Sequence, residues 1–332
     1  VANNLSAAAL ADDAFTNTTS AAVNVVYTVV PVSAEGCIGN PFTVTVTVNP
    51  EPVVAIQNLT PGSDSPLTGF TLGNDTDGAP AVVSYNITTI NLNGLTISAG
   101  SPATGNGLPA TELANDAFTN TTSAAKDVVY TVVPVGDNGC LGNPFTVTVT
   151  VNPEPVVANQ LKSICSDGPL GISLNPSTSI AAATYNITAI TQNGLVASAG
   201  NPATGTGLAA NVIADDAFTN TTSTAVDVIY NVTPVSADGC QGNPFTLTVT
   251  VNPEPVVADQ TRTVCSDAPL GVNFNSSTSV AAATYNVTAL NLNGLTVSAG
   301  GAAVANGLSV AALADDAFTN NTNAPVNVIY TV

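Results

Sequence analysis

One sixteen-residue stretch recurs along the chain and constrains its organisation more than any other feature. NPFTVTVTVNPEPVVA occupies residues 40–55, returns unchanged at 143–158, and returns with one Val replaced by Leu at 243–258. A second marker, DAFTN, starts at positions 13, 116, 216 and 316, which gives spacings of 103, 100 and 100 residues. A period near 100 residues is too long for a solenoid repeat and matches a whole small domain. The sequence therefore predicts domains joined in tandem.

The phase of the repeat divides the chain into two complete and two partial copies. We expect complete copies over residues 53–153 and 156–253, with the NPEP motif at each boundary. Residues 1–50 correspond to the C-terminal half of a copy, and residues 256–332 correspond to the N-terminal part of one. We expect the chain to be an internal fragment, because it opens at Val1 without a signal peptide or an initiating Met.

Within a copy, apolar and polar residues alternate in the manner of half-buried β-strands. PFTVTVTV at 144–151 places its Phe and Val residues on one face and its Thr residues on the other. VDVIYNVTP at 226–234 has the same period and directs Val228, Tyr230 and Val232 inward. The other residues expected inside are Tyr130, Val132, Phe145, Val147 and Val149, and those expected outside are Thr146, Thr148 and Thr150.

Turn signals complete the prediction of the fold class. Asn193-Gly194 lies between two apolar runs, and this pair accepts the positive φ values of a type I′ hairpin turn. Each copy then holds about seven strands with a turn signal roughly every 8–12 residues, which predicts an all-β, antiparallel β-sandwich. The segment at 5–15 is the one stretch with a helix-like composition, and we expect strand and loop there because its counterpart at 108–118 has no continuous apolar stripe.

Composition excludes several classes of function. The chain has no His, Met or Trp, and only three basic residues, Lys126, Lys162 and Arg262, stand against 22 acidic ones. The net charge of −19 disfavours nucleic acid and anionic membranes, which bind to clustered Lys and Arg. No run of 18 or more apolar residues exists, so we expect no membrane insertion in this segment. Without His or an activated nucleophile, we expect no enzyme activity and no catalytic or cofactor-binding residue.

Several motifs together resemble a known class of repeat. They are VCSDAPLGVNF at 264–274, ATYNVT at 283–288, FTNTTS, YTVVPV and GCLGNPFTVTVTVNPEP. On these motifs the whole chain resembles the PKD-like, immunoglobulin-like repeats of giant cell-surface adhesins of the Bacteroidota, including gliding-motility adhesins exported by the type IX pathway. The resemblance implies a tandem array of Ig-like/PKD-like sandwiches in a long extracellular protein at the cell surface. The chain departs from the pattern at Gly62, where the next two copies have Cys165 and Cys265.

The five cysteines fall into two classes, which leaves their pairing open. Cys165 and Cys265 belong to CSD motifs, and Cys37, Cys140 and Cys240 belong to GC motifs. A bond between Cys165 and Cys240 would close a loop of roughly 75 residues and stabilise by about 4 kcal/mol. Against it, a sandwich places its first turn and its last hairpin at opposite ends. The alternatives are a staggered bond, from the CSD of one copy to the GC of the next, and unpaired small residues.

Acidic motifs suggest calcium, which binds six to eight oxygen ligands. The candidate ligands are Asp75, Asp77, Asp215 and Asp216, with Asp12, Asp13, Asp315 and Asp316 at related positions. An EF-hand reading of the first pair fails, because the twelfth position is Asn86 and not Glu. Solvated turn carboxylates are the alternative. Sequons at Asn86 and Asn220 are also candidates for glycosylation.

Two functions suit a tandem array of this kind. In the first, the segment is a stiff, force-bearing spacer in a long extracellular fibre that supports adhesion or gliding, with a surface or glycan ligand bound at a distal tip. In the second, it is the subunit of an extracellular filament, in which copies associate laterally or by strand addition. The NPEP prolines favour extended, semi-rigid joints between neighbouring repeats. An exposed edge on the TVTVTV strand would favour the filament.

Overall fold

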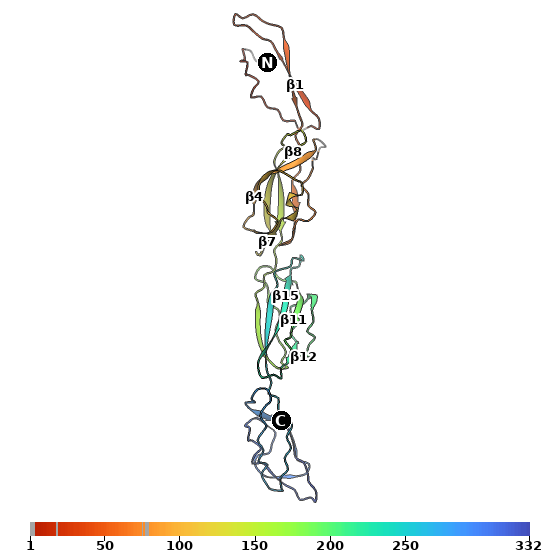
Figure 1. Cartoon of the computed structure of the whole chain (residues 1–332), viewed down its shortest axis with the longest axis vertical. Helices are drawn as coiled ribbons and strands as arrows, with labels where there is room; N and C mark the ends of the chain where they lie inside the picture. Colours follow the sequence, from red (N-terminus) through yellow and green to blue (C-terminus); the bar gives the residue numbers. More distant parts are fainter. Residues whose placement is uncertain (1–3, 18, 75, 77–79) are drawn as a thin grey trace. The chain divides into compact units, whose positions relative to one another are not determined.

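The computed structural model describes residues 4–17, 19–74, 76 and 80–332, and this part of the chain is almost entirely β (Figure 1). The one helical element among the described residues is a short 3-10 helix, η1 at Glu112–Asn115. Residues 4–15 form turns and irregular structure, so no helix replaces the expected loop there. The prediction of an all-β tandem array is confirmed.

The second repeat is a two-layer sandwich of seven strands. These are β3 (Gln57–Leu59), β4 (Val82–Asn91), β5 (Thr96–Ala99), β6 (Gly105–Leu108), β7 (Ala117–Thr119), β8 (Lys126–Gly136) and β9 (Phe145–Val151). The large sheet has the order β3-β9-β8-β4-β6, and the small sheet pairs β5 with β7. Side chains from both sheets meet in one core, which includes Tyr130 from β8, Val147 from β9 and Phe118 from β7.

The third repeat has the same strands in the same order. They are β10 (Gln160–Cys165), β11 (Thr184–Thr191), β12 (Val196–Ala199), β13 (Gly205–Leu208), β14 (Ala217–Thr219), β15 (Val226–Val235) and β16 (Phe245–Asn252). The large sheet is ordered β10-β16-β15-β11-β13, and β12 pairs with β14. Tyr185 and Phe245 pack edge to face in its interior, with ring centroids 6.4 Å apart.

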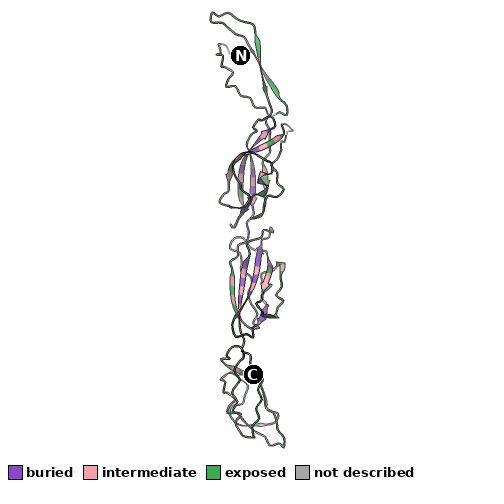
Figure 2. Cartoon of the chain, viewed as in Figure 1, coloured by how far each residue is buried: buried purple, intermediate pink, exposed green. Residues whose placement is uncertain are grey.

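The flanking segments contain two-stranded sheets only. They are built from β1 (Val23–Val29), β2 (Phe42–Val48), β17 (Tyr285–Val287), β18 (Ala289–Asn291), β19 (Thr296–Ala299), β20 (Ala305–Leu308), β21 (Ala317–Thr319) and β22 (Ile329–Thr331). The pairs are β1-β2, β17-β20, β18-β22 and β19-β21. Figure 2 shows that the buried residues concentrate in the two seven-stranded repeats.

The alternating pattern of β8 and β9 is confirmed by burial. Tyr130, Val132, Val147 and Val149 are completely buried, and Phe145 is 4% exposed. Val228, Tyr230 and Val232 of the third repeat are also completely buried. The threonines on the opposite face of β9 are half-buried instead of fully exposed. The reason is that β9 lies between β3 and β8 in the sheet, so neighbouring strands cover part of both its edges.

The first strand of each complete repeat pairs in parallel with the last one, which the purely antiparallel prediction did not include. Gln57, Asn58 and Leu59 of β3 lie opposite three successive residues of β9. In the third repeat the parallel ladder is longer, because six residues of β10, from Gln160 to Cys165, lie opposite Leu247–Asn252. The remaining strand pairs are antiparallel.

The Asn-Gly turn has the expected backbone but joins different sheets. Asn193 and Gly194 have φ values of 49° and 88°, as a type I′ turn requires. The strands on either side do not pair with each other, because β11 belongs to the large sheet and β12 pairs with β14. The prediction of a hairpin at this point was therefore wrong. Leu195 follows the turn and is 7% exposed, so its burial carries the chain across to the second layer.

Contacts within the chain define two compact units, and their boundary does not follow the repeats. The first unit is the chain up to Val157 together with two loops of the third repeat, Pro176–Thr184 and Thr233–Asn243. The second unit is Ala158–Asn175, Tyr185–Val232 and Pro244–Val332. The two loops are therefore grouped with the end of the second repeat and not with the body of their own.

Candidate functional site

The NPEP motif at residues 152–155, here called the tail motif, is fastened to the second repeat. The backbone N–H of Glu154 donates to the carbonyl oxygen of Asn120 at 2.9 Å. Asn120 is itself completely buried, and its side-chain amide donates to the carbonyl oxygens of Ala124 and Val151. The tail motif thus continues β9 on a fixed course as it leaves the sandwich.

The loop between β15 and β16, residues 236–244, is here called the cap loop and is closed by its own hydrogen bonds. The N–H of Ser236 donates to the carbonyl oxygen of Cys240 at 2.9 Å. Gly239 has a φ of 81°, a conformation that favours glycine and accounts for the glycine of the GC motif. The cap loop therefore has a defined shape of its own.

The cap loop of the third repeat packs on the tail motif of the second. The amide Nδ2 of Asn243 donates to Oε1 of Glu154 at 3.4 Å. A Cβ atom added to Gly242 would overlap the carbonyl oxygen of Pro155, so the two backbones approach as closely as glycine permits. We call this contact, between the tail motif of one repeat and the cap loop of the next, the joint.

The preceding joint is built in the same way. Residues 136–144 form the cap loop of the second repeat, in which Nδ2 of Asn143 donates to Oε1 of Glu51 at 3.1 Å. Asn138 adds a hydrogen bond to the carbonyl oxygen of Pro50 at 2.9 Å. A Cβ on Gly142 would again overlap a carbonyl oxygen, that of Pro52. In the recurring stretch, GNP therefore belongs to the cap loop of one joint, and NPEP is the tail motif of the next joint.

A pair of serines fixes the chain just beyond the tail motif, and the sequence analysis missed them. The hydroxyl of Ser179 donates to the carbonyl oxygen of Glu154 at 2.6 Å, and both Ser177 and Ser179 accept from the N–H of Val156. Ser277 and Ser279 make the same contacts in the next copy. The signal was present in the sequence as an STS triplet that recurs after 100 residues.

Glu154 carries a carboxyl group in an unusual environment. The side chain is completely buried, its Oε2 atom has no hydrogen-bond donor, and the nearest ionisable group is the carboxylate of Asp64. Burial, together with the hydrogen bond and the charge of Asp64, raises the pKa of Glu154 to about 7. Burial also acts on Asp64, but hydrogen bonds from Thr119, Ser98 and Glu154 outweigh it and lower the pKa of that group. Glu154 is therefore protonated below about pH 7, and in that form it can donate a hydrogen bond to the carboxylate of Asp64.

This arrangement predicts that the joint loses stability as pH rises. The pKa of Glu154 is higher in the folded chain than in the unfolded one, so its contribution is complete below about pH 4.5 and disappears as pH passes 7. The expected loss is about 1–3 kcal/mol, since each pKa unit corresponds to about 1.4 kcal/mol. Calorimetric melting at pH 5 and pH 8 measures it.

The Glu154→Gln variant provides the comparison. An amide of the same size can donate a hydrogen bond to Asp64 at every pH. The melting temperature of the variant should therefore differ little between pH 5 and pH 8. Glu254→Gln is the matched control, because Glu254 occupies the same motif and is only half-buried. If Glu154→Gln retains the full pH dependence of the unmodified chain, the proton of Glu154 is not its source.

The described aspartates among the proposed calcium ligands either accept a hydrogen bond from a tyrosine or are exposed to solvent. Asp216 is 2% exposed and accepts a hydrogen bond from the hydroxyl of Tyr230 at 2.8 Å. Burial raises the pKa of Asp216, and the bond from Tyr230 partly offsets this effect. Asp215 is exposed. Asp75 and Asp77 lie outside the described residues, and no group of three Asp, Glu, Cys or His side chains suited to a metal occurs among the residues that are described.

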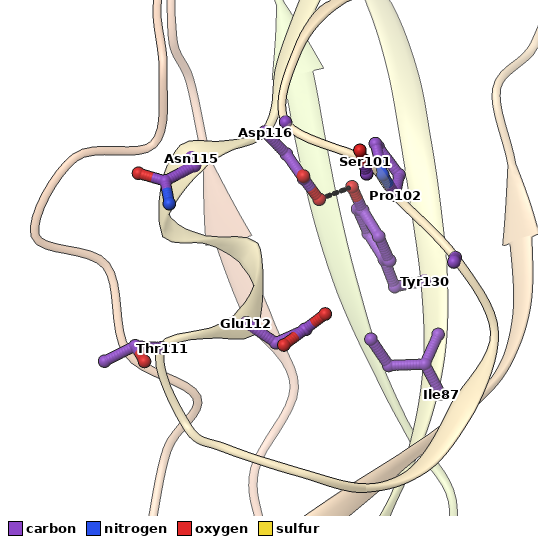
Figure 3. A pocket seen from close by; sticks show the side chains of 10 residues that line it. Ile87, Ser101, Pro102, Thr111, Glu112, Asn115, Asp116 and Tyr130 are labelled. Carbon is purple, nitrogen blue, oxygen red and sulfur yellow. Dashed lines mark hydrogen bonds between the residues drawn. The ribbon is translucent and has the colours of Figure 1, made fainter.

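The same tyrosine–aspartate pair borders a pocket in the second repeat. Tyr130 donates to Asp116 at 2.7 Å, and Figure 3 shows this bond at one side of a cavity of about 500 Å³. Glu112 from η1 and Ile87 from β4 also line it. Two carboxylates are fewer than the oxygen ligands calcium requires. The third repeat has Val212 in place of Glu112, so the acidic lining is not a repeated feature.

All five cysteines are free thiols in the structure. Cys165 is exposed and lies opposite Asn252, the last residue of β16, whereas Cys240 lies in the cap loop that precedes that strand. The structure does not join these two residues. The sulfur of Cys240 lies instead beside Gly62 of the second repeat.

The candidate glycosylation site at Asn220 is closed in the folded repeat. Asn220 is completely buried, and its Nδ2 donates to the carbonyl oxygens of Thr224 and Val251. Its Oδ1 accepts from Thr222, the third residue of the sequon. The recurring FTNTT motif therefore serves to fix the end of the last strand.

Comparison with known protein families identifies the repeats. The model of the PKD-like domain matches residues 3–52, 88–155 and 162–255, which together make up more than half of the chain. The chain belongs to the PKD-like domain family. No curated protein matches it. No helix of the described PKD-like repeats is long and apolar enough to cross a membrane, and the matched family is a PKD-like domain, not a family of enzymes.

Solved structures similar to the PKD-like array are themselves multidomain. The EC1-2 segment of human protocadherin-24 is 13% identical, with 60% of this chain and 95% of that one covered and a TM-score of 0.24. The chicken CNTN1 FN1-FN3 domains are 12% identical, with 82% and 98% covered and a TM-score of 0.22. Fibronectin(III)-like modules of Clostridium thermocellum CbhA are 12% identical, with 60% and 91% covered and a TM-score of 0.21.

Proposed function

We propose that this segment is a stiff, force-bearing spacer in a long extracellular protein at a cell surface. It supports adhesion or gliding by holding a distal ligand-binding region away from the cell, and its immediate partners are the neighbouring repeats of the same chain. The observation that carries the proposal is the joint, in which the cap loop of one repeat is seated on the tail motif of the one before it.

The composition of the joint supports stiffness. Pro153 and Pro155 fix their own φ angles and hold the preceding residues in extended conformations. Hydrogen bonds reach Glu154 from both sides, through its N–H to Asn120 and through its side chain from Asn243. A backbone that is fixed in φ and bonded on both sides has little freedom to bend.

The alternative function, a filament formed by strand addition, finds no open edge on the TVTVTV strands of the two complete repeats, although among the described strands β2 of the first segment pairs with β1 alone. It required an open edge on the TVTVTV strand, but β9 lies between β3 and β8, and β16 lies between β10 and β15. Both edges of these strands are already paired in the complete repeats. Lateral association by other surfaces remains the competing outcome of the experiment below.

A bulky residue in the cap loop tests whether the joint makes the array of repeats stiff. Gly242→Val places a side chain against the carbonyl oxygen of Pro155 and should unseat the loop. We expect small-angle X-ray scattering to show a narrow distribution of conformations for the unmodified chain and a broader one for the variant. Gly301→Val is the control, because Gly301 has an ordinary φ and no atom within 4 Å of an added Cβ.

Two results would count against the proposal. Identical scattering from the Gly242→Val variant and the unmodified chain would mean that the joint does not set the stiffness. A molecular mass that increases with concentration, measured by light scattering, would favour the filament.

A further inference from the structure

The cap loop places a thiol against a position that is a cysteine in other repeats. Cys240 is 6% exposed, and a Cβ built on Gly62 would lie 3.6 Å from the Cβ of Cys240 and 2.8 Å from its sulfur. Disulfide-bonded cysteines have Cβ atoms about 3.5–4.5 Å apart. The two positions therefore have the separation of a disulfide, although they belong to different repeats.

The repeat alignment supplies the missing half of the pair. The position of Gly62 in the second repeat is occupied by Cys165 in the third and by Cys265 in the fourth. The position of Cys240 is occupied by Cys140 in the second repeat and by Cys37 in the first. Each complete repeat thus carries a cap-loop position facing the repeat before it and a first-strand position facing the repeat after it.

We propose that these cysteines are the halves of staggered disulfides, each joining the end of the first strand of one repeat to the cap loop of the next. In this chain the joint between the second and third repeats lacks the bond because Gly62 replaces the first-strand cysteine. The inference rests on the geometry of the joint and goes beyond the spacer function. A repeat array without these bonds could still bear force.

The length of β16 argues against a bond inside one repeat. Cys165 lies level with Asn252 at the end of β16, and the cap loop with Cys240 precedes the start of that eight-residue strand. At about 3.3 Å per residue, the eight residues of β16 span roughly 25 Å. Disulfide-bonded residues have Cα atoms less than about 7 Å apart. A disulfide of Cys165 is therefore expected to take its second cysteine from another repeat.

Formation of the bond is an ordinary thiol–disulfide exchange. The two cysteine thiols lose two protons and two electrons as their S–S bond forms. A small disulfide oxidant accepts both, and its own S–S bond is reduced to two thiols. Oxidised glutathione is such an oxidant and serves as the probe.

The test adds the missing cysteine to the joint between the second and third repeats. Gly62→Cys adds a sixth thiol to the chain, at a position whose φ is ordinary for any residue. After treatment with oxidised glutathione, we expect the peptides that contain position 62 and Cys240 to lose one thiol each and to become joined, with a combined mass about 2 Da below the sum of the two reduced peptides. Non-reducing peptide mapping should show the introduced cysteine joined to Cys240.

Matched variants separate proximity from general reactivity. Asn58→Cys introduces an exposed thiol on the same strand and should form no bond to Cys240. Gly62→Cys combined with Cys240→Ser should keep its introduced thiol free. Gly62→Ser, compared by circular dichroism, shows that a side chain at this position allows folding.

Two outcomes would overturn the inference. One is an introduced thiol at position 62 that stays free, or pairs elsewhere, in a variant that is folded. The other is a peptide joining Cys165 to Cys240 in the oxidised, unmodified chain, which would establish the bond within the repeat.

Discussion

Stretched from its two ends in a single-molecule instrument, the third repeat is expected to unfold at a higher force than the second. Both events should release about 350 Å of chain, the extended length of roughly 100 residues. The difference in force comes from the parallel ladder between the first and last strands. It runs unbroken over six residue pairs in the third repeat, whereas in the second repeat three pairs are followed by a break at Thr60 and Pro61 and then by the single pair Gly62–Asn152.

The direction of loading makes this ladder decisive. Force enters a repeat through its first strand and leaves through its last strand, and these two strands are parallel neighbours. Pulling them apart along their length loads their hydrogen bonds together instead of one at a time. A shorter, interrupted ladder should therefore yield at a lower force.

The sequence offers a matched exchange that tests the ladder. Pro61 follows β3 and has no N–H to donate, and its counterpart in β10 is Ile164. Ile164→Pro should lower the unfolding force of the third repeat toward that of the second, and Pro61→Ile should raise that of the second. Because each variant copies a residue already present in the other repeat, both should fold. Unchanged forces in both variants, or extension without discrete events, would contradict a mechanical role for this ladder.

A second large effect is expected from a single aromatic residue. Phe145→Ala should destabilise the second repeat by about 3–5 kcal/mol, because Phe145 is 4% exposed and its removal leaves a cavity among close-packed side chains. In a repeat of roughly 100 residues, this loss should lower the melting temperature by about 12 °C or more. Differential scanning calorimetry measures the shift.

The chain contains its own controls for this change. Phe42 has the same neighbours in sequence, but it is 50% exposed in the first segment, so Phe42→Ala should have a much smaller effect. Thr148→Ala on the other face of β9 should cost well under about 1 kcal/mol. Equal losses for Phe42→Ala and Phe145→Ala would show that local sequence, and not burial, sets the stability.

The sequence was most informative where residues act locally. Alternation along β8 and β9 identified the buried residues, because a strand directs successive side chains to opposite faces. The positive φ values of the Asn-Gly turn were also predictable from residue type. The turn connects two sheets instead of two paired strands because Leu195 is buried in the second layer, and this burial depends on distant residues.

Features that depend on partners far along the chain were not predictable. The parallel pairing of β10 with β16 joins residues about 87 positions apart, and nothing in either strand specifies a parallel partner. The buried carboxyl of Glu154 was expected only as part of a proline-rich joint, because its neighbours are distant in sequence: Asp64 follows the first strand of the same repeat, and Asn243 lies in the cap loop of the next one. The joint was recognisable as a recurring motif, but its chemistry was not.

In each complete repeat, a cap loop and a tail motif, which belong to two successive joints, flank the last strand, and this placement limits how such a gene can vary. From Gly142 to Asn152, and again from Gly242 to Asn252, the count is the same, whereas the longer spacing between the first two DAFTN markers reflects extra residues near 71–80. The lengths of the copies thus differ near 71–80 and agree between the two joining surfaces. The cap loop and the tail motif are different surfaces that face opposite ways. Each added copy therefore lengthens the array and does not close it into a ring. Duplication or loss of one whole unit would leave every remaining contact intact, so related genes should differ in the number of units more readily than in the sequence of this strand.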